Sequence, residues 1–209
     1  MRNLIQALLF FFLLIFCENI AGKNVKDSQV VKKSQDYYVK VVGITDGDTF
    51  TGLTDSKQQI KIRIYGIDAP EKNQAFGTRS KQYLANLIFG KQVRITPQLT
   101  KKGRPKRSWD RFVAWVYTSD GKDVSAEMLK AGMAWRFKKY DSTPEYAKYE
   151  AEARKARIGL WIDKKPVAPW NFRRKKKQNF IHSVNNSFGI DNNSLSNFIC
   201  FFSPLPPVT

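Results

Sequence analysis

The chain has few of the side chains that enzymes use for nucleophilic or soft-metal chemistry. Its two cysteines, Cys17 and Cys200, lie near opposite ends of the 209 residues, and its single histidine is His182. The middle of the chain therefore holds neither a disulfide framework nor a thiolate zinc site. Histidine-based ribonucleases, histidine–metal nucleases and Ser-His-Asp hydrolases are excluded because their base is missing. Any catalysis must use carboxylates, Lys, Arg or Tyr, with a metal bound through oxygen if one is used.

Acidic side chains are also a minority, with 18 Asp and Glu against 36 Lys and Arg and a net charge of +18. Only Arg2, Glu18 and Asp191 among these charged residues lie outside residues 23–177, so the positive excess belongs to that stretch. A hydrophobic content of 42% is enough to build a core, which argues against a mainly disordered chain. A surface this cationic favours a polyanionic partner: nucleic acid first, anionic membrane or polysaccharide second. A charge excess that serves only solubility is the alternative.

Residues 1–22 have the pattern of a targeting segment. Arg2 precedes a nearly continuous run of Leu, Ile and Phe at residues 4–16, and Ala21 and Gly22 are small residues near a cleavage point. The apolar run is shorter than the roughly 20 residues that span a bilayer. We expect a cleaved signal peptide and a secreted or periplasmic product. A retained N-terminal membrane anchor is the alternative.

The pattern after this segment predicts one folded domain at residues 36–165, preceded by a polar linker at 23–35. Short runs rich in β-branched and aromatic residues predict strands, and apolar residues at helical spacing predict helices between them. The predicted strands are 37–44, 49–53, 59–65, 92–97 and 112–117; the helices end near Gly90, Gly132 and Gly159. The first helix has Tyr83, Leu84, Leu87 and Ile88 on one face, and Ser125 is the expected N-cap of the second. This order predicts an α+β fold, mainly β: a small closed barrel with helices packed outside, as in an oligonucleotide-binding (OB) fold.

Carboxylates gather at the loop ends of these strands. Asp46 and Asp48 flank a glycine between the first two strands, although Asp-Gly is also ordinary hairpin chemistry. Asp68 and Glu71 follow the third strand, and adjacent strands would bring the two pairs together. Carboxylates and backbone carbonyls suit a hard cation such as Ca²⁺ or Mg²⁺. An arginine beside that cation, such as Arg63 on the third strand, suits a phosphate group.

Together with a third segment, these residues resemble the staphylococcal nuclease (thermonuclease) family over about residues 38–161. The motifs in order are D-G-D-T at 46–49, R-I-x-G-I-D-A-P-E at 63–71, D-R-F-V-A-W-V at 110–116 and A-E-A-R-K-A-R-I-G-L-W at 151–161. The resemblance implies a five-stranded OB-fold barrel with three helices. It also implies a Ca²⁺-dependent endonuclease, with Mg²⁺ second, that hydrolyses DNA and RNA phosphodiesters with little sequence specificity.

The same resemblance implies roles for particular residues. Three oxygen ligands for the metal are implied: Asp48, Asp68 and the backbone carbonyl of Ala69. Glu71 would hold or deprotonate the attacking water, and the residues leave both roles open. Arg63 and Arg111 would bind the phosphate and the charge that grows on it. Asp46 would lie beside the metal without binding it directly.

Further cations form a capture surface in this interpretation, although a solvated loop explains residues 101–107 equally well. The residues assigned to nucleic-acid binding are Lys101, Lys102, Arg104, Lys106, Arg107 and, as a base-stacking ring, Tyr140. Trp135 is expected to pack in the core. Residues 166–209 are basic and then rich in Asn and Ser, and we expect them to be disordered.

Two functions remain from the sequence alone. The first is an exported nuclease, monomeric and without a protein partner, that prefers single-stranded or flexible DNA and RNA. The second is a catalytically inert OB-fold module that only binds nucleic acid. The complete set of Asp48, Arg63, Asp68, Glu71 and Arg111 favours the enzyme, because an inert module is free to lose some of them.

Overall fold

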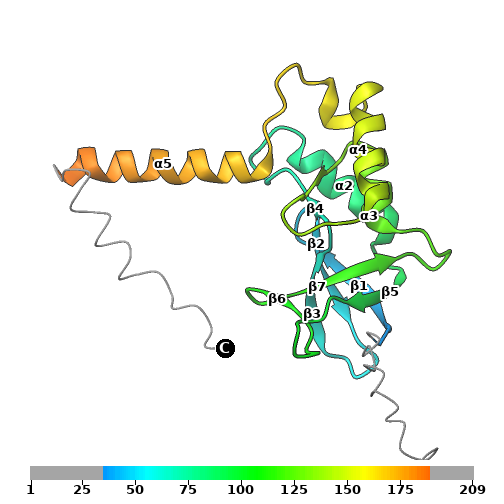
Figure 1. Ribbon diagram of the computed structural model, residues 1–209. Coiled ribbons are helices and arrows are strands. Elements are labelled where there is room, and N and C mark those ends of the chain that lie inside the picture. The colour runs from blue at the N-terminus through cyan, green and yellow to red at the C-terminus, as the bar shows by residue number, and fades with distance from the viewer. Residues whose placement is uncertain (1–34, 189–209) are drawn as a thin grey trace, which may run out of the picture. The chain divides into compact units, whose positions relative to one another are not determined.

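The computed structural model describes residues 35–188, which form one unit of strands and helices (Figure 1). In chain order the elements are β1 (Tyr37–Ile44), β2 (Thr49–Leu53), β3 (Gln59–Ile64), β4 (Ile67–Asp68), α2 (Gly77–Ile88), β5 (Gln92–Pro97), β6 (Arg107–Ser108), β7 (Arg111–Tyr117), α3 (Val124–Lys130), β8 (Trp135–Arg136), α4 (Pro144–Lys155), the 3₁₀ helix η1 (Gly159–Ile162) and α5 (Pro169–Phe188). The predicted signal segment and most of the predicted linker lie outside the described residues.

Five strands close into a barrel. The sheet runs β3-β2-β1-β5-β7, with β6 added beside β7, and all neighbours in this order are antiparallel. A parallel pairing of β3 with β7, in which Arg63 lies opposite Val113, joins the two sides of the sheet. The five-stranded barrel predicted from the sequence is confirmed. Its parallel closure places the end of β3 beside the start of β7, which matters for the arginines described below.

The barrel forms because its strands alternate between a buried and an exposed face. In β3, Ile62 and Ile64 are fully buried, whereas Lys61 before them is exposed and Arg63 between them is partly buried. The large side chains that fill the core come from strands and helices alike: Val39, Val41, Phe50, Ile62, Ile64, Leu84, Ile88, Val93, Val116, Met128 and Leu129. Burying such side chains contributes about 1.5–3 kcal/mol each before the entropy cost of folding.

Helices α2, α3 and α4 lie together above one end of the barrel (Figure 1). Leu84 and Ile88 of α2 are the residues predicted to face the core, and both are fully buried. The predicted start of α3 needs a correction. Its N-cap is Asp123, whose carboxylate accepts hydrogen bonds from the amides of Ser125 and Ala126. Ser125 was the predicted cap, but its hydroxyl donates to the buried carbonyl of Tyr65 instead.

The structure contains four helices besides η1 in residues 35–188, one more than predicted, and the extra one is α5. The expectation of a disordered tail therefore differs from the structure over residues 169–188. The helix begins where Ala168 and Trp170 join a second apolar cluster with Trp135, Leu160 and Trp161. This cluster also bears out the packing role predicted for Trp135. Within the residues that the structure describes, no helix is both long and apolar enough to cross a membrane.

Candidate functional site

The loop between β1 and β2 holds the first pair of carboxylates. The Asp48 amide donates to the Asp46 carboxylate at 3.0 Å, which closes a tight turn around Gly47. No side chain fits at Gly47, since a Cβ there would lie 1.9 Å from the Ser80 hydroxyl and 2.7 Å from the Ala69 Cβ. The glycine therefore lets this loop pack against α2 and against the segment that follows β4.

The segment after β4 holds the second pair. The Ala69 amide donates to Asp48 Oδ2 at 2.7 Å, so a buried hydrogen bond joins the two carboxylate-bearing segments. The Glu71 amide donates to the Gln74 side chain, and the Gln74 amide donates back to the Glu71 carbonyl. A Cβ at Gly77 would lie 2.0 Å from that carbonyl, so the first residue of α2 must be glycine for Glu71 to sit here.

Arg63 bridges the two pairs from β3. Its Nη1 lies 2.7 Å from Asp48 Oδ1 and its Nη2 lies 3.1 Å from Asp68 Oδ1. The Arg63 side chain is 13% exposed and the Asp68 side chain only 2%, so the bridge is shielded from water. Nη1 is buried and, although close to Asp48, makes no hydrogen bond of good geometry to any described residue. Its positive charge therefore faces the Asp48 carboxylate.

Arg111 approaches from the start of β7. Its Nη1 donates to the Thr49 hydroxyl at 3.3 Å, and that hydroxyl donates to Asp48 Oδ1 at 3.0 Å. Its Nε donates to the Ser108 carbonyl, which orients the guanidinium plane. Because β3 and β7 run parallel, Arg63 and Arg111 reach the same end of the barrel.

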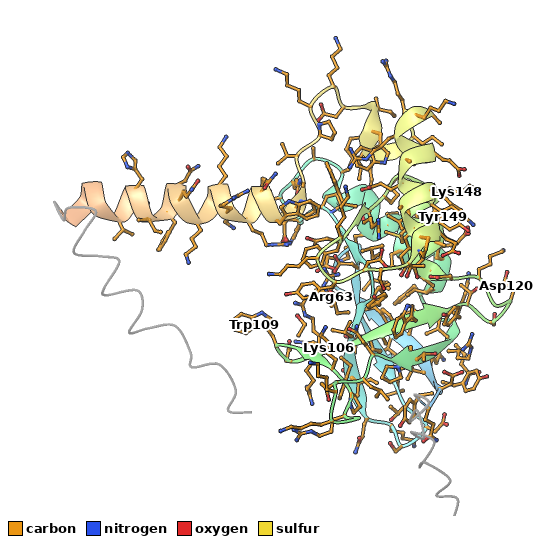
Figure 2. All side chains as sticks on the ribbon, viewed as in Figure 1. Arg63, Lys106, Trp109, Asp120, Lys148 and Tyr149 are labelled. Atoms are coloured by element: carbon orange, nitrogen blue, oxygen red, sulfur yellow. The ribbon has the colours of Figure 1, made fainter. Side chains whose placement is uncertain are left out.

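These groups line one cavity of about 420 Å³. It brings together all seven residues that the sequence analysis assigned to the metal, its surroundings, the water and the phosphate: Asp46, Asp48, Arg63, Asp68, Ala69, Glu71 and Arg111. A neighbouring cavity of about 170 Å³ shares Arg63 and Ser108 with it and adds Lys106, Arg107 and Tyr140. Figure 2 shows Arg63, Lys106 and Trp109 on one side of the barrel, with Asp120 on the other.

Burial and repulsion between carboxylates raise the pKa of two of these acids. Burial, reinforced by the Asp48 carboxylate, raises the pKa of Asp46 to about 7. Burial also raises the pKa of Asp68, although a hydrogen bond from Arg173 and the charge of Arg63 act in the opposite direction. Carboxylates this shielded are costly to ionise without a cation beside them. The site is thus built to hold positive charge.

The donor set fits a hard divalent cation. Asp48 and Asp68 present carboxylate oxygens to the same Arg63 guanidinium, so an ion between them would find two carboxylates, with carbonyl and water oxygens to complete the shell of Ca²⁺. No group of three or more His, Cys, Asp or Glu side chains is arranged as a metal site in residues 35–188.

The structure adds two residues that the sequence analysis did not assign to the site. Trp109, at the tip of the β6–β7 turn, is 80% exposed and lines the larger cavity. Arg173 of α5 lines it as well and contacts Asp68 and Glu71 directly. Trp109 directly precedes the motif at residues 110–116, whereas Arg173 stands in a basic run that carries no sign of its contact.

Only some of the cations in the basic loop at residues 101–107 line a cavity of the site. Lys106 and Arg107 line the smaller cavity, and the Lys106 ammonium lies 5.0 Å from the centre of the Tyr140 ring. That ring is 49% exposed and meets Phe137 edge to face, so it keeps a free surface beside the cavity. The exposed side chains Lys101, Lys102 and Arg104 line neither of the two cavities.

Comparison of the sequence with known proteins finds a matching family and several relatives. Residues 61–163 match the family described as staphylococcal nuclease homologue. An "Uncharacterized endonuclease" of Haemophilus influenzae is 43% identical over 140 residues, covering 67% of this chain and 75% of that protein. "Protein ParB" of Escherichia coli is 41% identical over 140 residues, covering 65% and 78%. A "Micrococcal nuclease" of Shigella flexneri is 37% identical over 148 residues, covering 68% and 83%.

Proposed function

The chain belongs to the staphylococcal nuclease family, and we propose that it is an exported, Ca²⁺-dependent endonuclease that hydrolyses DNA and RNA. The observation that carries the proposal is the single cavity in which Asp48, Asp68 and Glu71 meet Arg63 and Arg111. Paired acids alone would fit a structural ion, and paired arginines alone would fit a binding surface. Phosphodiester hydrolysis requires both, because a water must be directed at a phosphorus whose negative charge is neutralised.

The cation would be held by Asp48, Asp68 and the Ala69 carbonyl. When bound, it supplies positive charge next to the phosphate. Mg²⁺ is the second candidate, since it also binds one or two carboxylates while waters complete its octahedral shell.

The other residues act on the substrate and the water. Arg63, with a buried Nη1 that has no hydrogen-bond partner among the described residues, donates to a phosphate oxygen. Arg111, oriented by Ser108 and Thr49, donates to a second oxygen. Their hydrogen bonds strengthen as charge grows on these oxygens in the transition state. Glu71, with a side chain 40% exposed, holds the attacking water and accepts its proton.

The surroundings of the cavity support a flexible, single-stranded substrate. The exposed Trp109 ring and the half-exposed Tyr140 ring lie at the edges of the two cavities, where unpaired bases can stack on them. Lys106 and Arg107 add positive charge beside Tyr140 for the backbone. A paired, stacked duplex would have to open before its bases could reach these rings.

The proposal that the protein is exported rests on residues 1–22 and on their signal-like order of charge, apolar run and small residues. Expression of the full chain in a bacterial host tests it directly. We expect the protein in the periplasm or medium with a new N-terminus near residue 22. A product that stays in the membrane with Met1 intact would instead identify a retained anchor.

The test of the activity is a cleavage assay with the full chain on single-stranded DNA and RNA. We expect Ca²⁺-dependent cleavage that a chelator abolishes, and Glu71→Gln should lower turnover by about 10²–10⁴-fold, as expected for loss of a general base. Glu152→Gln is the matched control, since Glu152 is an exposed acid of α4 outside both cavities. Salt-sensitive binding without cleavage would identify the inert OB-fold module instead.

A further inference from the structure

Arg173 lies outside the matched family region and makes the most extensive side-chain contact with the site. Its Nη2 donates to Asp68 Oδ2 at 2.7 Å, and its Nη1 donates to Glu71 Oε1 at 2.6 Å and to Asp68 Oδ1 at 3.2 Å. One guanidinium thus joins the carboxylates assigned to the cation and to the attacking water. Both Asp68 oxygens are occupied, because Oδ1 also accepts from Arg63.

The fold holds Arg173 in this place through the start of α5. Trp170, three residues earlier, packs its ring 5.6 Å from that of Trp135 and 5.8 Å from that of Phe137. The Gln74 amide group donates to the Val167 carbonyl at 2.5 Å, which links the chain just before α5 to the segment of Glu71. Residues three apart on a helix are neighbours, so the anchored Trp170 directs Arg173 toward the cavity.

The contact conflicts with the binding of a cation. A guanidinium and a divalent cation both use the lone pairs of Asp68, and its two oxygens already accept three hydrogen bonds, one from Arg63 and two from Arg173. A cation that binds Asp68 in the cavity therefore competes with these arginines, and its charge repels both guanidinium groups. Arg63 is 13% exposed on a barrel strand, whereas Arg173 is 45% exposed on a helix, so Arg173 is the one with room to move.

We propose that Arg173 is a positioning residue that takes the place of the divalent cation on Asp68 while it also holds Glu71, and that cation binding displaces it from Asp68. The proposal rests on the metal ligands of the proposed function. In the cation-free protein Arg173 keeps two repelling carboxylates together, which leaves the site formed before the ion arrives. The same contact competes with the ion, so Arg173 sets the cation concentration at which the site is loaded.

Cation binding without nucleic acid tests the proposal. Isothermal titration calorimetry with Ca²⁺ is carried out on the full chain and on its Arg173→Gln and Arg174→Gln variants. Arg174→Gln is the matched control, because it removes the same charge one residue away. The Arg174 side chain contacts Asn171 on α5. We expect Arg173→Gln to bind Ca²⁺ about tenfold more tightly, the size of one charged hydrogen-bonded contact. Arg174→Gln should stay within about twofold of the parent chain.

Several results would overturn the proposal. Equal tightening in both variants would show a general charge effect, and weaker binding by Arg173→Gln would show that the arginine supports the ion. Binding that is absent or unchanged in every variant would also overturn it. An Arg173→Lys variant keeps the charge and loses the two-pronged contact, so its affinity should fall between those of the parent chain and Arg173→Gln.

A second readout follows the cation-free state. Arg173→Gln should lower the midpoint of thermal unfolding without Ca²⁺, because Asp68 and Glu71 then repel each other, and saturating Ca²⁺ should restore the midpoint. The cleavage assay separates this inference from the proposed function. Unchanged Ca²⁺ affinity in Arg173→Gln together with lost cleavage in Glu71→Gln would refute the former and leave the latter standing.

Discussion

Two arginines hold the same carboxylate from opposite parts of the molecule. Arg63 reaches Asp68 from strand β3 of the barrel, and Arg173 reaches it from a helix that begins after the matched family region. Arg63 stands five residues before Asp68, with its backbone paired on both sides by β2 and β7. Arg173 stands 105 residues after Asp68 and depends on the ring contacts of Trp170.

The two arginines have different roles in the proposals above: Arg63 acts on the substrate, whereas Arg173 controls the binding of the cation. A side chain enclosed by the barrel keeps its place whether the site holds cation, phosphate or neither. A half-exposed side chain at the start of a helix can leave with little disturbance of the core. In the proposed mechanism the barrel therefore provides the catalytic arginine, and α5 provides a displaceable one.

The largest expected effect comes from removing the enclosed arginine. Arg63→Gln should lower turnover by about 10²–10³-fold, because one donor to the developing oxyanion is lost. It should also lower the free energy of unfolding by about 3 kcal/mol, since Asp48 then keeps a buried charge without a guanidinium partner in the described residues. Cleavage rates and urea unfolding without Ca²⁺ measure the two effects.

Arg94→Gln is the control for this prediction. Arg94 is also a strand arginine, on β5, but its side chain is 33% exposed and that of its partner Asp36, 2.8 Å away, is 42% exposed. We expect a loss of at most about 1 kcal/mol and unchanged turnover. Equal losses of stability and turnover in the two variants would remove the distinction between enclosed and surface arginines.

A smaller effect is expected from loosening α5. Trp170→Ala removes the ring that packs on Trp135 and Phe137, so the free energy of unfolding should fall by about 1–2 kcal/mol. Arg173 then loses its anchor, and Ca²⁺ should bind more tightly, as it does in the expected result for Arg173→Gln. Urea unfolding and calorimetry measure these effects.

The control for Trp170→Ala is Phe180→Ala, which removes a ring of α5 that is 67% exposed. Neither stability nor Ca²⁺ affinity should change measurably in this variant. If Trp170→Ala left the Ca²⁺ affinity unchanged while destabilising the fold, the position of Arg173 would not depend on the anchored start of α5.

The barrel could be predicted from local pattern because each strand carries its own signal. The bounds of β1, β2 and β5 coincide with the predicted runs, since alternation and turn residues are properties of neighbouring positions. The predicted N-cap of α3 was wrong because a contact distant in sequence decides it. Ser125 is a good cap by local rules, but a buried carbonyl 60 residues earlier needed its hydroxyl, and Asp123 caps the helix instead.

The candidate site likewise has residues that local motifs predict and one residue that they do not. The seven residues assigned to the metal, its surroundings, the water and the phosphate sit in short motifs on strand ends, and barrel closure brings them to one cavity. Arg173 looked like one cation in a run of five, at residues 173–177, with no local mark of its role. Its place follows from the packing of Trp170 against residues more than 30 positions away, which periodicity does not reveal.

The smallest expected effect concerns two pairs of surface lysines, one on α5 and one on the basic loop at residues 101–107. Lys176 and Lys177 of α5 line a surface cavity together with Glu71, whereas Lys101 and Lys102 of the basic loop line neither cavity of the site. Each phosphate contact to a single strand contributes about 0.7 to the slope of log affinity against log salt. Lys176→Gln with Lys177→Gln should therefore lower that slope by about 1.4, and Lys101→Gln with Lys102→Gln should lower it by less than about 0.7.

The slopes are measured by fluorescence anisotropy with single-stranded DNA, on Glu71→Gln protein so that the strand stays intact. Both pairs remove two charges, which keeps the long-range field equal, and only a direct backbone contact distinguishes them. Equal slopes would mean that position relative to the cavity is irrelevant and that the cations act only through net charge. A larger change for Lys101 and Lys102 would place the backbone along the basic loop. In that case α5 would control the cation through Arg173 without also guiding the substrate.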